Sequence, residues 1–406
     1  MLAVVVVGVL TGIVGALLTL LLHAAQHLVF GADGTSFAQD VRLASPPRRL
    51  IGMTIAGAMI GLAWWQLRRR MRVVRVREAM ADPSQRLPFR SSALDAITQI
   101  VAVGAGASLG REGAPRQVAA AVAESVATRL GFDAPHRRVL LGCAAGAGLA
   151  AVYNAPVAGV LFAVEIVLVS VDYVAIASAA LMSCIAVVVA WPVVGWNAVY
   201  QLGTHRTASD VWVWALVAGP VCAVAGLGFN RLMDAARWNA PTRPDRLLPV
   251  RVTVAMALVG LVAMSLPGVT GNGKSVLEAL VGRGGLSAGV LVALLLGKPL
   301  LTAVCLRGGL VGGLITPSMA TGGALGALVA LALGHDQGGT SMIVCAMVGA
   351  AAMLATTQHA PIMAGVFMLE VSQAPPTLWG PVVLAVAGAW LTSRLIARWK
   401  VVGSNQ

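Results

Sequence analysis

The stretch that decides the fold is GREGAP at residues 110–115, matched 202 positions later by GGLITP at residues 312–317. Each stretch is rich in glycine, ends in proline and opens a helix of small residues. Glycine permits a tight, non-helical backbone, and proline suits the first turn of a helix because it donates no N–H there. We therefore expect two broken helices. In the first copy, the amides of Gly113 and Ala114 should point freely from a helix N-terminus.

A second pair of matching segments lies downstream, at an offset of 205 positions. The matched residues are Leu149, Ala150, Ala155, Pro156, Phe162 and Glu165, which recur as Leu354, Ala355, Ala360, Pro361, Phe367 and Glu370. Two matches in the same order indicate two homologous membrane repeats, residues 1–203 and 204–406. Such repeats, interrupted by Gly and Pro at corresponding positions, are typical of transporters and channels whose ion site lies at the midplane between the halves.

Composition places both repeats in a membrane. Hydrophobic residues make up 58% of the 406 positions, charged residues only 11%, and the mean hydropathy is +0.83. A soluble domain carries about a quarter of its residues as charges. The apolar stretches long enough to approach or exceed one span are 2–22, 50–67, 139–170, 175–194, 211–229, 252–266, 290–304, 342–369 and 381–396. We predict an all-α, multi-pass membrane protein with re-entrant helices and no separate soluble domain.

The net charge of +13 comes almost wholly from arginine. Nucleic-acid binding is disfavoured because the arginines lie in short loops between apolar spans, at positions 68–77 and 231–251, and near the end, at 394–400. Under the positive-inside rule these loops and the C-terminus are cytoplasmic, in the plasma or inner membrane. The same side chains can contact anionic lipid headgroups.

No cofactor, metal site or enzyme active site is predicted. The five cysteines are scattered singly through apolar segments, which fits neither disulfides nor a metal site. His23 and His27 have the spacing of a metal pair without an evident third ligand, so packing is favoured. GNGKS at residues 271–275 lacks the complete phosphate-loop pattern, and we interpret it as a turn.

Glu112 is the residue on which the functional prediction depends. A carboxylate within a membrane segment is costly and marks a functional site by default. At a helix N-terminus, which attracts anions, it can occupy an anion site as a tethered competitor. Protonation or a diffusing anion would then release it, so Glu112 is a candidate gate and proton carrier. The alternative interpretation is a capping carboxylate paired with Arg111.

Glu165 and Glu370 occupy equivalent positions in the two repeats. Equivalent carboxylates suggest a shared structural task, such as accepting bonds from exposed backbone amides or pairing with arginine. A place on a proton path is the other interpretation.

These motifs resemble those of the CLC chloride channel and transporter family over nearly the whole chain, without appended CBS domains. The matching residues are 110–113, Asn154, Ala155, Pro156, Gly159, Glu165, 313–317, Ala360, Pro361 and Glu370. The resemblance implies inverted repeats and a homodimer with one anion pathway in each subunit. It further implies that Glu112 is the gating glutamate and that the backbone amides facing the anion are those of Gly113, Ala114, Leu314 and Ile315.

Several positions depart from the family pattern. Ala114 replaces a proline, and Pro115 follows one place later. The segment with an anion-coordinating serine is missing, and Met71 falls nearest to that position. No tyrosine occurs where the family has one, around Val402, and the inner proton-accepting glutamate falls at Ile166. The expected anion site is therefore built mostly from backbone.

The leading functional hypothesis is transport of chloride-like anions, either as a voltage-gated channel or as a proton-coupled antiporter. Fluoride export is the runner-up, because the customary serine and tyrosine are missing. The alternative outside the class of transport proteins is a non-conducting membrane scaffold. If the protein is a scaffold, Glu112→Ala should leave anion flux unchanged.

Overall fold

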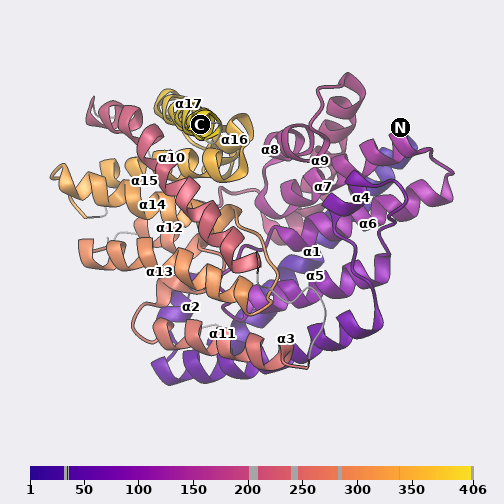
Figure 1. Ribbon diagram of the computed structural model, residues 1–406, viewed down its shortest axis with the longest axis horizontal. Coiled ribbons are helices and arrows are strands. Elements are labelled where there is room, and N and C mark those ends of the chain that lie inside the picture. Colours follow the sequence, from indigo (N-terminus) through magenta and orange to yellow (C-terminus); the bar gives the residue numbers. More distant parts are fainter. Residues whose placement is uncertain are drawn as a thin grey trace.

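The computed structural model describes residues 1–31, 34, 36–200, 209–238, 246–281, 286–337 and 339–403. Helices make up nearly all of this part, and Figure 1 shows them packed into one body. The predicted all-α membrane fold is confirmed. Within the described residues, eight helices are long and apolar enough to span a membrane. They are α1 (Leu2–Phe30), α3 (Pro46–Arg70), α9 (Tyr173–Val194), α10 (Ser209–Trp238), α13 (Ala288–Arg307), α14 (Ile315–Ala332), α15 (Thr340–Gln358) and α17 (Trp379–Gly403).

The other helices fill the space between these spans. They are α2 (Phe37–Leu43), α4 (Val76–Ala81), α5 (Phe89–Gly104), α6 (Gly113–Arg129), α7 (Ala134–Tyr153), α8 (Pro156–Leu161), α11 (Leu248–Ala263), α12 (Lys274–Val281) and α16 (Pro361–Val371). A π-helical stretch, η1 (Phe162–Leu168), continues α8, and the 3₁₀ turns η2 (Pro267–Val269) and η3 (Pro376–Leu378) complete the set. A helix satisfies its own backbone hydrogen bonds, which lipid cannot do.

The backbone breaks at equivalent places in the two repeats, just after α7 and just after α15. Asn154 and His359 adopt left-handed conformations with φ of 51° and 55°, and they end α7 and α15. The next residues, Ala155 and Ala360, both have φ of −134°. They precede Pro156 and Pro361, and a residue before proline is disfavoured from the helical region. The division of the chain at 203 and 204 lies outside the described residues and stays a prediction.

Small residues bring the central helices into close contact. A Cβ added at Gly322 of α14 would lie 2.5 Å from the Gly349 carbonyl oxygen of α15, and one at Gly148 of α7 would lie 2.6 Å from the Pro115 carbonyl oxygen of α6. Such close approach is how helices associate in lipid, where the hydrophobic effect does not drive them together. In the most apolar window of α15, 89% of the residues are buried, against 28% in α17. In α14, which begins in the 312–317 stretch, 72% of the most apolar window is buried, so this helix too is largely shielded from lipid.

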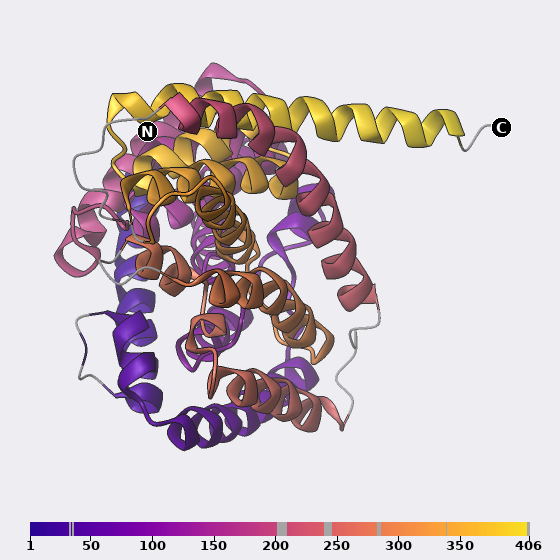
Figure 2. The same ribbon diagram turned by 90° about the vertical axis from the view of Figure 1, so that its left-hand side faces the viewer.

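The outer helices surround this centre. Helix α3 packs against α11 where Gly57 faces Met256 and Gly61 faces Pro249. In Figure 2 the C-terminal part of α17 projects well beyond the rest of the molecule. The first and second halves of the chain lie mainly on opposite sides of the view in Figure 1, and contacts between them include those of α3 with α11 and of α8 with α16.

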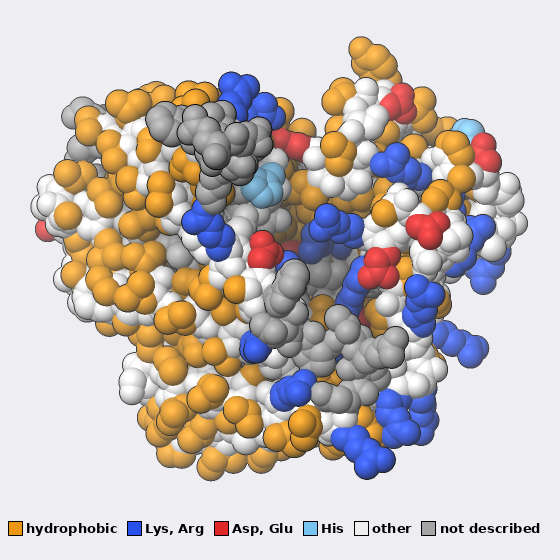
Figure 3. Space-filling view, in the orientation of Figure 1, with side chains coloured by type: hydrophobic (Ala, Val, Ile, Leu, Met, Phe, Trp, Pro, Cys, Tyr) orange, Lys and Arg blue, Asp and Glu red, His pale blue; other side chains and the backbone are white. Residues whose placement is uncertain are grey.

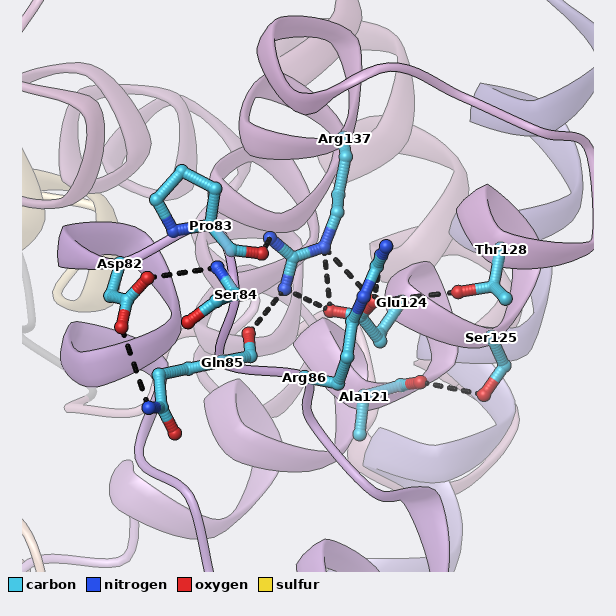
Figure 4. A network of polar contacts seen from close by, with 10 residues as sticks. All are labelled: Asp82, Pro83, Ser84, Gln85, Arg86, Ala121, Glu124, Ser125, Thr128 and Arg137. Atoms are coloured by element: carbon cyan, nitrogen blue, oxygen red, sulfur yellow. Dashed lines mark hydrogen bonds and ion pairs between the residues drawn. The ribbon is translucent and has the colours of Figure 1, made fainter.

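A buried ionic network fixes the far end of α6 (Figure 4). Arg137 of α7 donates from Nε to both oxygens of Glu124 of α6, each at 2.9 Å, and from a terminal nitrogen to the Gln85 carbonyl at 2.7 Å. Arg86 adds a bond of 3.0 Å to Glu124. The network ties the segment between α4 and α5 to two central helices, so α6 is anchored at the end opposite the candidate site.

Candidate anion site

The two glycine-rich stretches meet in space. The Gly110 amide donates to the Gly313 carbonyl, and the Gly313 amide donates to the Gly110 carbonyl, both at 2.8 Å. This antiparallel pair joins equivalent breaks in the two repeats. Because α6 and α14 begin within three residues of it, the pair sets both helix starts beside one another.

Neither glycine of this pair has room for a side chain. A Cβ added to Gly110 or to Gly313 would overlap the carboxylate of Glu112. Both positions therefore need glycine because of close approach, and not because of an unusual backbone angle.

Glu112 lies between the two breaks and is 0% exposed. Its Oε1 accepts a hydrogen bond of 2.6 Å from the Ile315 amide, at the first residue of α14. Its Oε2 accepts from the Tyr153 hydroxyl at 3.3 Å and lies 3.5 Å from the Thr316 hydroxyl. The carboxylate thus binds at the helix start of the other repeat, where free amides and the helix dipole favour negative charge.

The alternative interpretation of Glu112, a capping carboxylate paired with Arg111, does not describe the structure. Glu112 makes no side-chain cap on α6, and no ion pair to Arg111 occurs among the described residues. Arg111 instead donates to the Val152 carbonyl at 2.7 Å, with its guanidinium 4.9 Å from the centre of the Tyr153 ring. Arg116 donates from Nε to the Glu112 carbonyl at 2.7 Å and holds the backbone at this point.

The four amides expected from the family resemblance lie at these two helix starts. Gly113 and Ala114 are the first two residues of α6, and Pro115 takes the third position without an N–H. In α14 Ile315 comes first and Pro317 third, with Leu314 as the preceding cap residue. The first amides of a helix have no partner within it. In this structure the Ile315 amide donates its hydrogen bond to the Glu112 carboxylate.

Two hydroxyl groups at the site were not predicted from the sequence. The Tyr153 side chain, buried at the end of α7, packs edge to face on Phe367 with ring centres 5.2 Å apart. Thr316 follows Ile315 in α14. Thr316 belongs to the stretch 312–317, and Tyr153 lies between the matched residues Ala150 and Ala155. Nothing in the spacing shows that their hydroxyls face Glu112. They supply polar contacts to the Glu112 carboxylate.

Glu165 and Glu370 make matching contacts across the repeats. Glu165 accepts bonds from the Ile362 and Met363 amides at 3.3 and 2.7 Å, at the start of α16. Glu370 accepts from the Val157 and Ala158 amides at 2.9 and 2.7 Å, at the start of α8. Each carboxylate thus caps the helix of the opposite repeat. Ile166 lies beside Glu165 in η1.

Two cavities each have a lining residue that is next in sequence to the Gly110–Gly313 pair or its neighbours. The larger, of about 760 Å³, is lined by Gly312, by Met71 and by arginines at the end of α3. The smaller, of about 310 Å³, is lined by Arg111, His23 and polar side chains of α2 and α12. Gly312 and Arg111 each adjoin the residues of the Gly110–Gly313 pair in sequence.

The remaining motifs lie beside the smaller cavity. His23 and His27 both line it, and the described residues contain no group of three His, Cys, Asp or Glu side chains that could hold a metal. Residues 271–275 form a turn into α12, with positive φ at Gly271 and Gly273. The buried Lys298 of α13 donates to the Gly271 carbonyl at 2.6 Å and fixes this turn.

A buried carboxylate held between two broken helix starts, inside a bundle of spanning helices, defines a multi-pass membrane transport protein. The family model described as "Voltage gated chloride channel" matches residues 52–394. The chain belongs to this family, as its motifs predict.

Individual relatives and structures agree with this assignment. The chain is 31% identical to a ClcB-like chloride channel protein of Ralstonia nicotianae, over 96% of this chain and 92% of that protein. It resembles the structure of a slow cyanobacterial Cl⁻/H⁺ antiporter, with a TM-score of 0.83 at 20% identity over 98% and 94% of the two chains. The structure of a CLC-type fluoride/proton antiporter gives a TM-score of 0.76 at 19% identity over 97% and 94%.

Proposed function

We propose that the protein carries chloride across the membrane and that Glu112 is its gate. The observation that supports this most directly is the bond from the Ile315 amide to the Glu112 carboxylate. A carboxylate bound at a helix N-terminus marks a position where a negative charge is stable. The glutamate behaves as a tethered anion in the position that a free anion would take.

Transport follows from competition for this position. A chloride ion that enters from either cavity meets the amides of Gly113, Ala114, Leu314 and Ile315 when Glu112 moves away. The ion loses water in this buried place, and oriented amides replace that water without a full positive charge. Return of the carboxylate then displaces the ion toward the other opening.

Protonation of Glu112 is the second way to release it. A neutral carboxylic acid loses most of its attraction to the helix dipole, so a proton opens the gate and travels with the side chain. Glu165 and Glu370 have a different task in this proposal: each holds two backbone amides, and this keeps α8 and α16 in place. Chloride is favoured over fluoride because the protein with the higher TM-score is a Cl⁻/H⁺ antiporter.

The test is anion efflux from proteoliposomes, with chloride, nitrate and fluoride compared in the presence and absence of a pH gradient. We expect chloride flux that a proton gradient drives. A reversal potential that ignores the gradient would identify a channel. Fluoride flux with negligible chloride flux would overturn the choice of ion, and absence of any flux in well-folded protein would favour a scaffold.

We further propose a homodimer with the arginine-rich face in the cytoplasm. Val157 and Ile362 are repeat equivalents at the starts of α8 and α16, and they are 53% and 62% exposed. Apolar side chains on adjacent capped helices suit a contact between subunits. The arginines near the ends of α3 and α17 support the orientation by the positive-inside rule.

A further inference from the structure

The larger cavity has a charge that transport of a small anion does not require. Its lining contains six arginines and one carboxylate, that of Glu78. The arginines are Arg68, Arg69, Arg70, Arg72, Arg75 and Arg237. They come from the end of α3, the segment after it and the end of α10. Figure 3 shows how Lys and Arg side chains gather on one part of the molecule, whereas much of the rest of that face is hydrophobic.

Several of these arginines are already held in position. Arg68 donates to the Gly309 carbonyl at 3.0 Å and lies over the Trp64 ring, while Arg69 lies 4.7 Å from the centre of the Trp65 ring. Arg75 pairs with Asp95 at 2.6 Å. Guanidinium groups fixed in this way lose little freedom when they bind, and their planar forks match phosphate oxygens.

The size of the cavity also exceeds what one halide ion needs. Its volume of about 760 Å³ lies within the range of roughly 300–1,000 Å³ that is usual for sites of organic ligands. Its lining includes residues 309–312, and Gly312 is next in sequence to the glycine that lies against Glu112. A bulky anion can enter this cavity, but the packed site at Glu112 leaves it no way through.

We propose that this cavity binds a chain of phosphate groups, either free oligophosphate or the headgroup of a phosphorylated lipid, and that the bound ligand closes the anion pathway. The effect on flux rests on the proposed transport function, whereas the binding does not. The bound ligand closes the anion pathway because it fills the part of the cavity next to Gly312. Chloride alone, at one charge, engages too few of the arginines to be retained.

The first experiment measures binding. Isothermal titration calorimetry of purified protein with tripolyphosphate, at constant ionic strength, should give one saturable site. The double variant Arg69→Gln/Arg72→Gln should bind about tenfold or more weakly, because charge-assisted bonds are lost. These two arginines are chosen because, within the described part of the chain, neither side chain donates to a backbone carbonyl, whereas Arg68 donates to that of Gly309. Arg129→Gln, at an exposed position outside the cavity, is the matched control and should bind normally.

The second experiment measures closure in proteoliposomes of mixed orientation. Tripolyphosphate does not cross the membrane, so external addition should inhibit the copies whose cavity faces outward, and addition to both sides should inhibit all. A parallel arm uses vesicles that contain a phosphoinositide. Inhibition in either arm that the double variant weakens supports the proposal and identifies the source of the phosphate. Equal inhibition by sulfate at matched ionic strength, or no binding in calorimetry, would overturn it. Binding without any chloride flux in the wild type would instead contradict the transport function.

Discussion

At the scale of single residues, Glu112 carries the functional argument. Glu112→Gln keeps the shape of the side chain but removes its charge and its proton equilibrium. We expect chloride flux that no longer depends on pH, with proton coupling lost, because the amide imitates the protonated gate. The measurement is efflux at several pH values, with Asp336→Asn, at an exposed position outside both cavities, as the control. Flux that still depends on pH in this variant would contradict the proposed proton role of Glu112.

Tyr153 gives a second test at this scale. Tyr153→Phe removes the hydroxyl that donates to Glu112 and leaves the ring on Phe367. A hydrogen bond to a charged group contributes about 1.5–3 kcal/mol, and this one, at 3.3 Å, lies at the weak end of that range. The carboxylate should therefore be released more easily. The chloride concentration that gives half-maximal flux should fall roughly two- to tenfold.

The control for this variant is Tyr173→Phe, because Tyr173 is 89% exposed at the start of α9. It should leave the concentration dependence unchanged. A half-maximal concentration that rises in Tyr153→Phe would show that the hydroxyl binds the anion and not the gate.

Sequence reasoning identified Glu112 because charge, glycine and proline coincide in one local stretch. It missed Tyr153 and Thr316 as partners of the carboxylate, since they lie 41 and 204 residues away and reach it through packing. The pattern of a motif shows that a helix begins, but it does not show which side chains from other helices face that beginning.

At the scale of elements, the reciprocal caps predict a defined loss of stability. Glu165→Gln and Glu370→Gln each replace a carboxylate that accepts two amide bonds at a helix start. Hydrogen bonds to charged groups contribute about 1.5–3 kcal/mol. Each variant should lower the melting temperature by several degrees in a thermal denaturation measurement. The exposed Glu78→Gln should melt as the wild type does, and unchanged melting in both cap variants would refute the structural role.

Gly313 tests the break itself. Gly313→Ala adds a Cβ where the Glu112 carboxylate lies, so the carboxylate must leave its position or the two breaks must separate. We expect altered pH dependence of flux, or a protein that no longer elutes as a single species in size-exclusion chromatography. Gly289→Ala is the matched control, because an added Cβ meets nothing within 4 Å there.

The element breaks could be predicted closely because Gly and Pro act locally on the backbone. The apolar stretch 139–170 is indeed interrupted, at Asn154 before Pro156. The π-helical form of η1 could not be predicted, because its residues FAVEIVL have no breaker among them. In this π-helical stretch Glu165 reaches the amides at the start of α16, and such contacts between distant segments are not visible in a local pattern.

At the scale of the whole molecule, the proposed homodimer predicts contact through the α8 and α16 face. Ile362→Cys should crosslink two subunits with a short bifunctional reagent, because Ile362 is exposed beside its repeat equivalent Val157. The readout is a band of doubled mass on a denaturing gel. Cys184 is also exposed and must be replaced by serine in both samples. Val383→Cys, on the exposed surface of α17, serves for comparison. A monomer mass by light scattering would contradict the proposal.

The reciprocal caps have a consequence for the origin of the chain. Each half contains a carboxylate whose amide partners lie in the other half, and each half exposes amides that it cannot satisfy itself. An ancestor of half the length would also have lacked partners for these amides. We infer that it worked as a pair of identical copies, each capping its neighbour, before gene duplication joined them. Covalent linkage then freed the two copies to diverge, so that one kept a glutamate at the shared centre and the other kept an uncharged glycine-rich turn.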